Sequence, residues 1–98
     1  MNPEKIKEFI ELAGTAPEGF CIAVTQHNTS SYYGFFELFE DADELSKHNK
    51  WRFIPINYCQ EYFYEKRALK KVNPDHSIII DGGTISNLEL IRDFSRAS

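Results

Sequence analysis

The stretch from Ser77 to Ile91, with the sequence SIIIDGGTISNLELI, decides the fold that we expect for this chain. Its first part, Ile78–Ile80, is a run of β-branched residues, which favours an extended strand with apolar neighbours on both faces. The pair Gly82-Gly83 follows, and two residues that accept positive φ angles predict a tight two-residue hairpin turn. The returning strand begins at Ile85 and breaks its apolar alternation once, near Asn87, which indicates a bulge or a bend. We therefore expect a strongly bent hairpin that seals a small barrel.

Length and composition limit the possible classes of protein. A chain of 98 residues predicts one domain over residues 1–98, in which roughly 60 to 65% of the unfolded surface is buried. Eleven basic against fifteen acidic residues leave a net charge of −4, which disfavours a protein that neutralises phosphates across an extended face. The sequence shows neither a signal peptide nor an apolar run of about 18 residues, so we expect a soluble, cytoplasmic protein. Cys21 and Cys59 stand apart and are expected to be reduced packing residues.

The N-terminal segment 1–14 is predicted to be an amphipathic helix. Asn2 can cap the free amide groups, and Pro3 suits the first helical position because it lacks an amide donor. Gly14 stands where a left-handed cap ends a helix. The apolar residues share one face, which we expect to dock on the sheet: Ile6, Phe9, Ile10 and Ala13.

Three further strands are predicted before the organising stretch, at residues 20–25, 32–40 and 51–56. The second contains Gly34, which indicates a bend or a close backbone approach. It also contains the adjacent Phe35 and Phe36, which must point to opposite faces, so the second face needs a cover from a helix or from another chain. The third strand contains Pro55, which places its end at an edge, at a bulge or just past the last pairing. Residues 41–50 are predicted to be a polar connector.

The segment from Tyr58 to Lys71 is predicted to be a second helix, because Asn57 and Gln60 form a capping-box pattern before it. The pattern leaves open whether this segment is a helix or an extended strand. The tail at residues 92–98 is polar apart from Phe94, and we expect it to fray.

An N-terminal helix followed by five short bent strands resembles the Sm-like fold, which is a small SH3-like barrel, and Ile78–Ile91 resembles the segment that closes such barrels. The resemblance implies a mostly β, five-stranded, bent-strand barrel, with an N-terminal helix and a further helix inserted before the last hairpin. Sm-like proteins carry an Arg-Gly pair in this hairpin that helps to hold a nucleotide, whereas the matching residues here are Asp81-Gly82. An acidic side chain repels phosphate, and residues 41–50 supply no matching nucleotide-binding motif. The resemblance therefore implies a barrel and assembly, and it argues against RNA binding in the Sm manner.

No group of residues forms a catalytic or metal-binding pattern. The three histidines, at positions 27, 48 and 76, lie in separate predicted loops without a second ligand at a short spacing. The acidic turn at residues 41–44 lacks the ligand spacing and the glycine of a calcium loop. Residues 81–84 lack the lysine and the following helix of a phosphate-binding loop. We expect a protein that is not an enzyme and that binds neither cofactor nor metal.

Aromatic residues make up 14% of the chain, which is more than a small barrel can hide. Because aromatic side chains concentrate at protein interfaces, the sequence predicts a non-catalytic interaction or assembly module that self-associates or binds another protein. The residues predicted for this interface are Phe35, Tyr62, Phe63, Tyr64 and Ile79. The alternative is a small RNA-binding barrel that stacks bases on aromatic rings and uses a local basic patch, although the net charge disfavours nucleic acid. The residues of that patch are Lys66, Arg67, Lys70 and Lys71.

Overall fold

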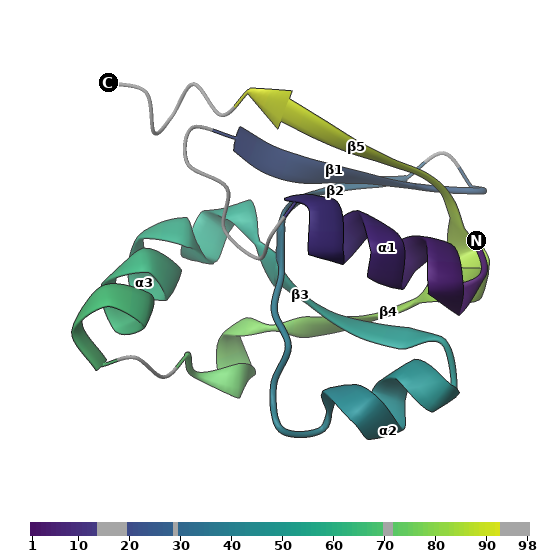
Figure 1. Ribbon diagram of the computed structural model, residues 1–98. Helices are drawn as coiled ribbons and strands as arrows, with labels where there is room; N and C mark the ends of the chain where they lie inside the picture. The colour runs from purple at the N-terminus through teal and green to yellow at the C-terminus, as the bar shows by residue number, and fades with distance from the viewer. Residues whose placement is uncertain (14–19, 29, 70–71, 93–98) are drawn as a thin grey trace.

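A computed structural model describes residues 1–13, 20–28, 30–69 and 72–92 of the protein (Figure 1). Five strands form one antiparallel sheet in the order β4-β3-β2-β1-β5. The strands are β1 (Phe20–Gln26), β2 (Ser31–Phe36), β3 (Lys50–Pro55), β4 (Ile78–Asp81) and β5 (Ile85–Arg92). The helices are α1 (Pro3–Ala13), α2 (Ala42–Lys47) and α3 (Cys59–Tyr64), and α3 continues as a π-helical turn at Glu65–Leu69. Short 3₁₀ turns lie at Ile56–Tyr58, Pro74–His76 and Gly82–Thr84.

The predicted hairpin between β4 and β5 is wrong, and the barrel is not closed. β4 pairs with β3 and β5 pairs with β1, so the two strands lie at opposite ends of the sheet. The reason is the turn at Gly82–Thr84, where the Asp81 carboxylate accepts a hydrogen bond of 2.9 Å from the Gly83 amide. The Thr84 hydroxyl donates a second bond, of 2.7 Å, to the Asp81 carbonyl. These local bonds make a 3₁₀ turn that carries the chain away from β4.

The predicted bulge in the last strand is confirmed. β5 pairs residue by residue with β1 until Asn87 lies opposite Thr25, and Ile85 then lies opposite Gln26. Ser86 is the additional residue in β5, and its hydroxyl donates a hydrogen bond of 3.1 Å to the Thr25 carbonyl. The bulge therefore bends β5 just after the 3₁₀ turn.

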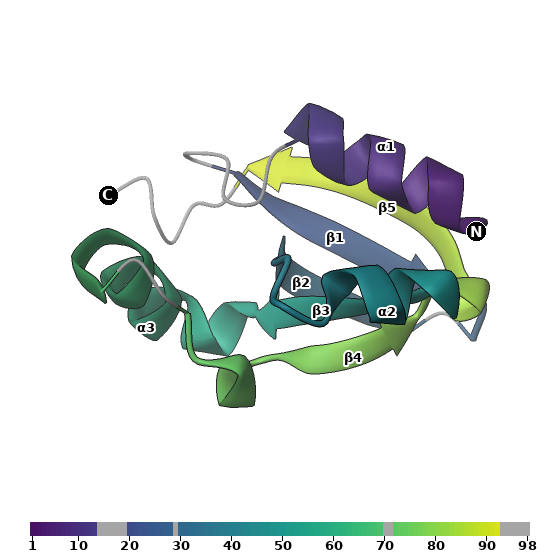
Figure 2. The same ribbon diagram turned by 60° about the horizontal axis from the view of Figure 1, so that its bottom comes forward.

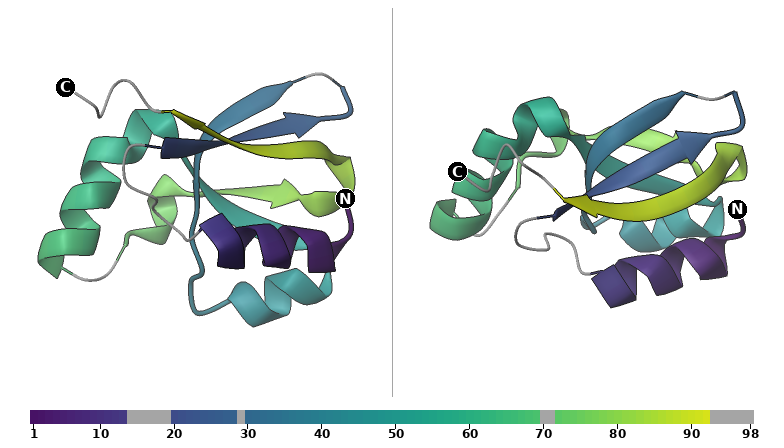
Figure 3. Two further views of the ribbon diagram at one scale, coloured as in Figure 1. Left: turned by 45° about the horizontal axis from the view of Figure 1, so that its top comes forward. Right: turned by 90° about the horizontal axis from the view of Figure 1, so that it is seen from above.

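Two cores form on the two faces of the sheet. One core packs under α1, which lies along one side of the sheet with α2 beside it (Figure 2). Its buried residues are Ile6, Ile10, Ile22, Val24, Phe36, Trp51, Phe53, Ile80 and Ile85. The other core packs under α3, which stands at the far end of the sheet in both views of Figure 3. Its buried residues are Cys21, Phe35, Ile54, Tyr62 and Val72.

Strand alternation lets the neighbouring Phe35 and Phe36 serve the two cores, and Gly34 before them lies at a close approach of two strands. A Cβ atom on Gly34 would clash with the backbone carbonyl of Ile54 on the adjacent strand, so β2 and β3 approach too closely for a side chain there. After this close approach Phe35 points into the core under α3 and Phe36 into the core under α1. The second face that the sequence left uncovered is thus covered by the chain's own helix.

The remaining boundaries follow local chemistry. The predicted connector at 41–50 contains α2, whose first turn holds Asp43 and Glu44 and whose last turn holds Lys47, in keeping with the helix dipole. The helix predicted from Tyr58 to Lys71 is confirmed from Cys59 to Leu69, as α3 and its π-helical continuation, and the extended alternative is wrong there; Lys70 and Lys71 lie outside the described residues. The second strand ends at Phe36 rather than at residue 40. Arg92 belongs to β5 rather than to a frayed tail, while Gly14 and residues 93–98 lie outside the described residues.

Candidate functional site

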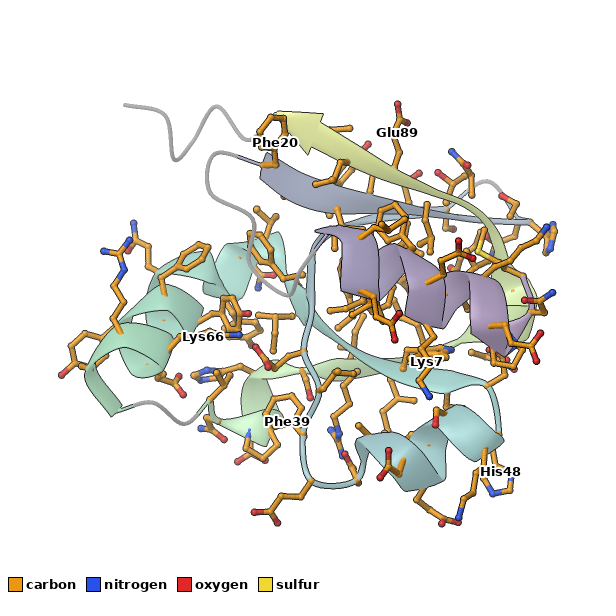
Figure 4. All side chains as sticks on the ribbon, in the orientation of Figure 1. Lys7, Phe20, Phe39, His48, Lys66 and Glu89 are labelled. Atoms are coloured by element: carbon orange, nitrogen blue, oxygen red, sulfur yellow. The ribbon has the colours of Figure 1, made fainter. Side chains whose placement is uncertain are left out.

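A groove of about 690 Å³ lies between the loop that follows β2, the strand β3, and the segments on and after α3. Ligand sites in proteins have volumes of about 300 to 1,000 Å³, so the groove is large enough to hold a ligand or a peptide segment. Lys66 and Phe39, which Figure 4 labels, come from the π-helical turn after α3 and from the loop between β2 and α2. The lining residues are Glu37, Leu38, Phe39, Glu40, Asp41, Arg52, Lys66, Val72 and Pro74.

A cluster of Tyr62, Glu37 and Lys66 ties α3 to the loop after β2. The hydroxyl of the buried Tyr62 donates a hydrogen bond of 2.7 Å to Oε2 of Glu37, whose side chain is 13% exposed. The Lys66 ammonium donates to the same oxygen at 2.6 Å and lies 5.3 Å from the centre of the Tyr62 ring. The ammonium therefore compensates the charge of a largely buried carboxylate, and the phenol hydroxyl shares the same acceptor.

An ion pair between Arg52 and Asp41 forms another part of the lining. Arg52 Nε lies 3.0 Å and Nη2 lies 2.7 Å from Oδ2 of Asp41, and Nη1 donates to the Ser77 hydroxyl at 2.9 Å. These hydrogen bonds from Arg52 lower the pKa of Asp41 and, in return, raise the pKa of Arg52. The guanidinium carbon also lies 5.7 Å from the centre of the Phe39 ring. The pair holds the loop after β2 against β3.

The Glu65 side chain anchors the wall of the groove that contains Val72 and Pro74. Glu65 is buried, and its Oε2 accepts a hydrogen bond of 2.5 Å from the Asn73 amide. Its Oε1 lies 2.9 Å from Nδ1 of His76, whose ring stacks on Tyr58 at 4.9 Å between centroids. The segment after α3 is thereby fastened to α3 itself, and the groove has a fixed wall.

The structure scatters the residues that the sequence predicted for the interface. Phe35 and Tyr62 are completely buried and stack at 5.5 Å between ring centroids, and Phe63 packs edge-on against Phe35 at 5.2 Å. These three rings fill the core under α3, so they present little or no surface to a partner. Tyr64 and Ile79 are 65% and 49% exposed, and they come from α3 and β4.

The predicted basic patch is brought together only in part. Lys66 is engaged by Glu37, Arg67 is exposed, and Lys70 and Lys71 lie outside the described residues. Two of the three histidines contact a carboxylate: His48 lies 3.7 Å from Glu44 of α2, and His76 contacts Glu65. Within the described ranges, no three His, Cys, Asp or Glu side chains gather as a metal site would require.

Sequence reasoning missed two features that only the three-dimensional arrangement reveals. The groove combines residues 37–41, 52, 66 and 72–74, which no short motif links. The open end of the sheet at β5 exposes an apolar side chain, since Leu90 is 40% exposed. The signal that could have found Leu90 is its alternation with Leu88 on a strand whose outer side pairs with no other described strand.

Comparison of the chain with protein-family models, with curated proteins and with solved structures gives no match. In the described part of the chain, every helix is too short or too polar to cross a membrane.

Proposed function

We propose that this chain is a non-catalytic protein-interaction module that assembles with copies of itself through the open ends of its sheet. We further propose that its fold is a variant of the small SH3-like or Sm-like barrel that stays open between β4 and β5. Two observations support this relation: an N-terminal helix covers the sheet, and the last strand pairs with the first.

The single observation that carries the proposal is the strand order β4-β3-β2-β1-β5, in which no other described strand pairs with the outer side of β4 or of β5. An edge strand presents a row of backbone N–H and C=O groups that can pair with another chain. β5 is eight residues long, which is long enough for a stable ladder, and it carries the exposed Leu90. β4 is shorter and carries the exposed Ile79.

Two symmetric arrangements would cover an open edge. Pairing of β4 with β5 of the next copy is head-to-tail, covers both edges and forms a ring when its rotation closes, whereas pairing of β5 with β5 is two-fold, gives a dimer and leaves β4 open. The two arrangements differ in whether Ile79 on β4 lies at the interface.

Sedimentation equilibrium at about 10 and 200 μM tests the proposal, because association by mass action raises the average mass with concentration. We expect Leu90→Lys to reduce the mass to that of the monomer in either arrangement. Ile79→Lys should do so only in the head-to-tail arrangement. Leu12→Lys is the matched control, because Leu12 is 83% exposed on α1 and lies on neither edge strand. A wild-type monomer at both concentrations would contradict self-association.

The RNA-binding alternative stays a prediction from the sequence. Lys66, one residue of the basic patch on which RNA binding would depend, already forms an ion pair with Glu37. No observation therefore favours RNA binding over protein interaction.

A further inference from the structure

We propose that the groove beside α3 binds a basic segment of a partner protein that carries an apolar anchor residue. The proposal concerns a site separate from the sheet edges: the groove is lined by the loop after β2, by β3 and by the segments on and after α3. It rests on the charge of the groove, on its apolar side chains and on its backbone.

Among the described residues, the lining of the groove has an excess of negative charge. These residues supply three carboxylates, on Glu37, Glu40 and Asp41, against the cations of Arg52 and Lys66. Glu37 and Asp41 already pair with those cations, which leaves the exposed Glu40 as the excess charge. Because the whole chain also has a net charge of −4, both the local and the long-range fields attract a cationic partner.

The existing ion pairs leave room for further donors. Oε2 of Glu37 accepts the hydrogen bonds from Tyr62 and Lys66, and the described residues offer no donor to its Oε1. Since a carboxylate oxygen has more than one lone pair, Glu37, Glu40 and Asp41 can each accept a bond from an ammonium or guanidinium group. An incoming anion, by contrast, would be repelled by these three carboxylates.

The apolar part of the groove comes from the same loop. Leu38 is 52% exposed, and Phe39 and Pro74 lie beside it in the lining. An exposed leucine next to a ring and a proline gives an apolar anchor a surface to cover, and anchors of this kind supply most of the binding energy at protein interfaces. A bare polyamine would leave this surface in water.

The backbone of the loop favours a peptide over a small cation. The Glu37 amide donates a hydrogen bond of 3.2 Å to the Arg52 carbonyl, so this residue still follows β3. Among the described residues, neither the N–H nor the C=O of Leu38 has a hydrogen-bond partner. A peptide backbone that passes Leu38 can bond to both groups, in the manner of an added strand.

The proposal is tested by measuring how three short, fluorescently labelled peptides bind to the full chain. In the first peptide Lys alternates with Leu, in the second Glu alternates with Leu, and in the third Lys alternates with Ser. By fluorescence anisotropy we expect the Lys–Leu peptide to bind at least about tenfold more tightly than either of the others, because only it satisfies both the charge and the apolar surface. Equal binding of the Lys–Ser peptide would overturn the apolar anchor. Equal binding of the Glu–Leu peptide, or no binding of any peptide, would overturn the proposal as a whole.

Matched variants locate the binding site. We expect Glu40→Lys to weaken binding of the Lys–Leu peptide by about tenfold or more, and Glu89→Lys to weaken it by less than about twofold, although both change the net charge equally. Both residues are exposed, and Figure 4 shows Glu89 on β5, on the far side of the molecule from the groove. In the same way Leu38→Ser should weaken binding and Leu12→Ser should not. Equal losses within either pair of variants would mean that the peptide binds by non-specific attraction, and would refute the groove as its site.

Discussion

Gly34 occupies a position in which a single methyl group is expected to be costly. The structure places the carbonyl of Ile54 where a Cβ atom on Gly34 would lie, so Gly34→Ala must push β2 and β3 apart or distort them. Overpacking of this kind costs about 1 to 3 kcal/mol, and we expect that loss in the free energy of unfolding in urea. Gly83→Ala is the control, because the nearest atom to its Cβ, Oδ1 of Asp81, is 3.3 Å away. Equal losses in the two variants would show that β2 and β3 do not approach as described.

The ion pair between Asp41 and Arg52 predicts a particular dependence of stability on pH. Hydrogen bonding from Arg52 lowers the pKa of Asp41 in the folded state, so the pair stabilises the fold above the ordinary pKa of aspartate. This contribution is lost as the pH falls through the lowered pKa. We therefore expect Asp41→Asn to lower the urea midpoint at pH 7, and the difference from the wild type to shrink as the pH falls below about 4. If the two proteins differ by as much in urea midpoint below about pH 4 as at pH 7, the charge of Asp41 is not the source of the difference.

At the scale of the element, α1 is expected to contribute to stability through one face only. Ile6 is completely buried against the sheet, whereas Leu12, on the same helix, is 83% exposed. Ile6→Ala should lower the free energy of unfolding by about 2 to 5 kcal/mol, through lost contacts and a cavity. Leu12→Ala should change it by less than about 0.5 kcal/mol. Urea unfolding of both variants measures the difference, and similar small losses would mean that α1 does not dock on the sheet.

Elements that depend on local rules were predicted well from the sequence. The first helix follows from Asn2-Pro3 and a periodic apolar face, and the amide of Lys5 does bond to the Asn2 side chain at 2.9 Å. The bulge near Asn87 and the end of β3 at Pro55 also follow from their own residues. The hairpin failed because a glycine pair accepts several turn types, and the Asp81 side chain selects the 3₁₀ turn. α2 was missed because its six residues are too few to show a helical period.

At the scale of the whole molecule, the candidate site could not be predicted from the sequence. Aromatic content predicted an exposed surface, but α3 covers the second face of the sheet and buries Phe35 and Tyr62 there. The groove depends on the same packing, because α3 brings Lys66 to Glu37 across 29 positions of the chain. Contacts of this range are set by the tertiary fold, which a pattern in a single sequence does not encode.

The two cores share one sheet, so we expect the domain to unfold as a single cooperative unit. β1, β2 and β3 each place residues in both cores, for example Phe35 and Phe36 on β2. Trp51 is the only tryptophan and lies in the core under α1, so its fluorescence reports on that core, while far-UV circular dichroism reports on all helices and strands.

The test of this cooperativity is a mild substitution in the opposite core. Ile54 is completely buried under α3, and Ile54→Val should cost about 0.5 to 1.5 kcal/mol. In a two-state domain both signals must move to the same lower urea midpoint, although Ile54 belongs to the core that Trp51 does not enter. Val24→Ala, in the core under α1, provides the converse variant and should also shift both signals together. If the circular dichroism midpoint falls in Ile54→Val while the Trp51 midpoint stays in place, α3 and its core unfold separately from the rest of the sheet.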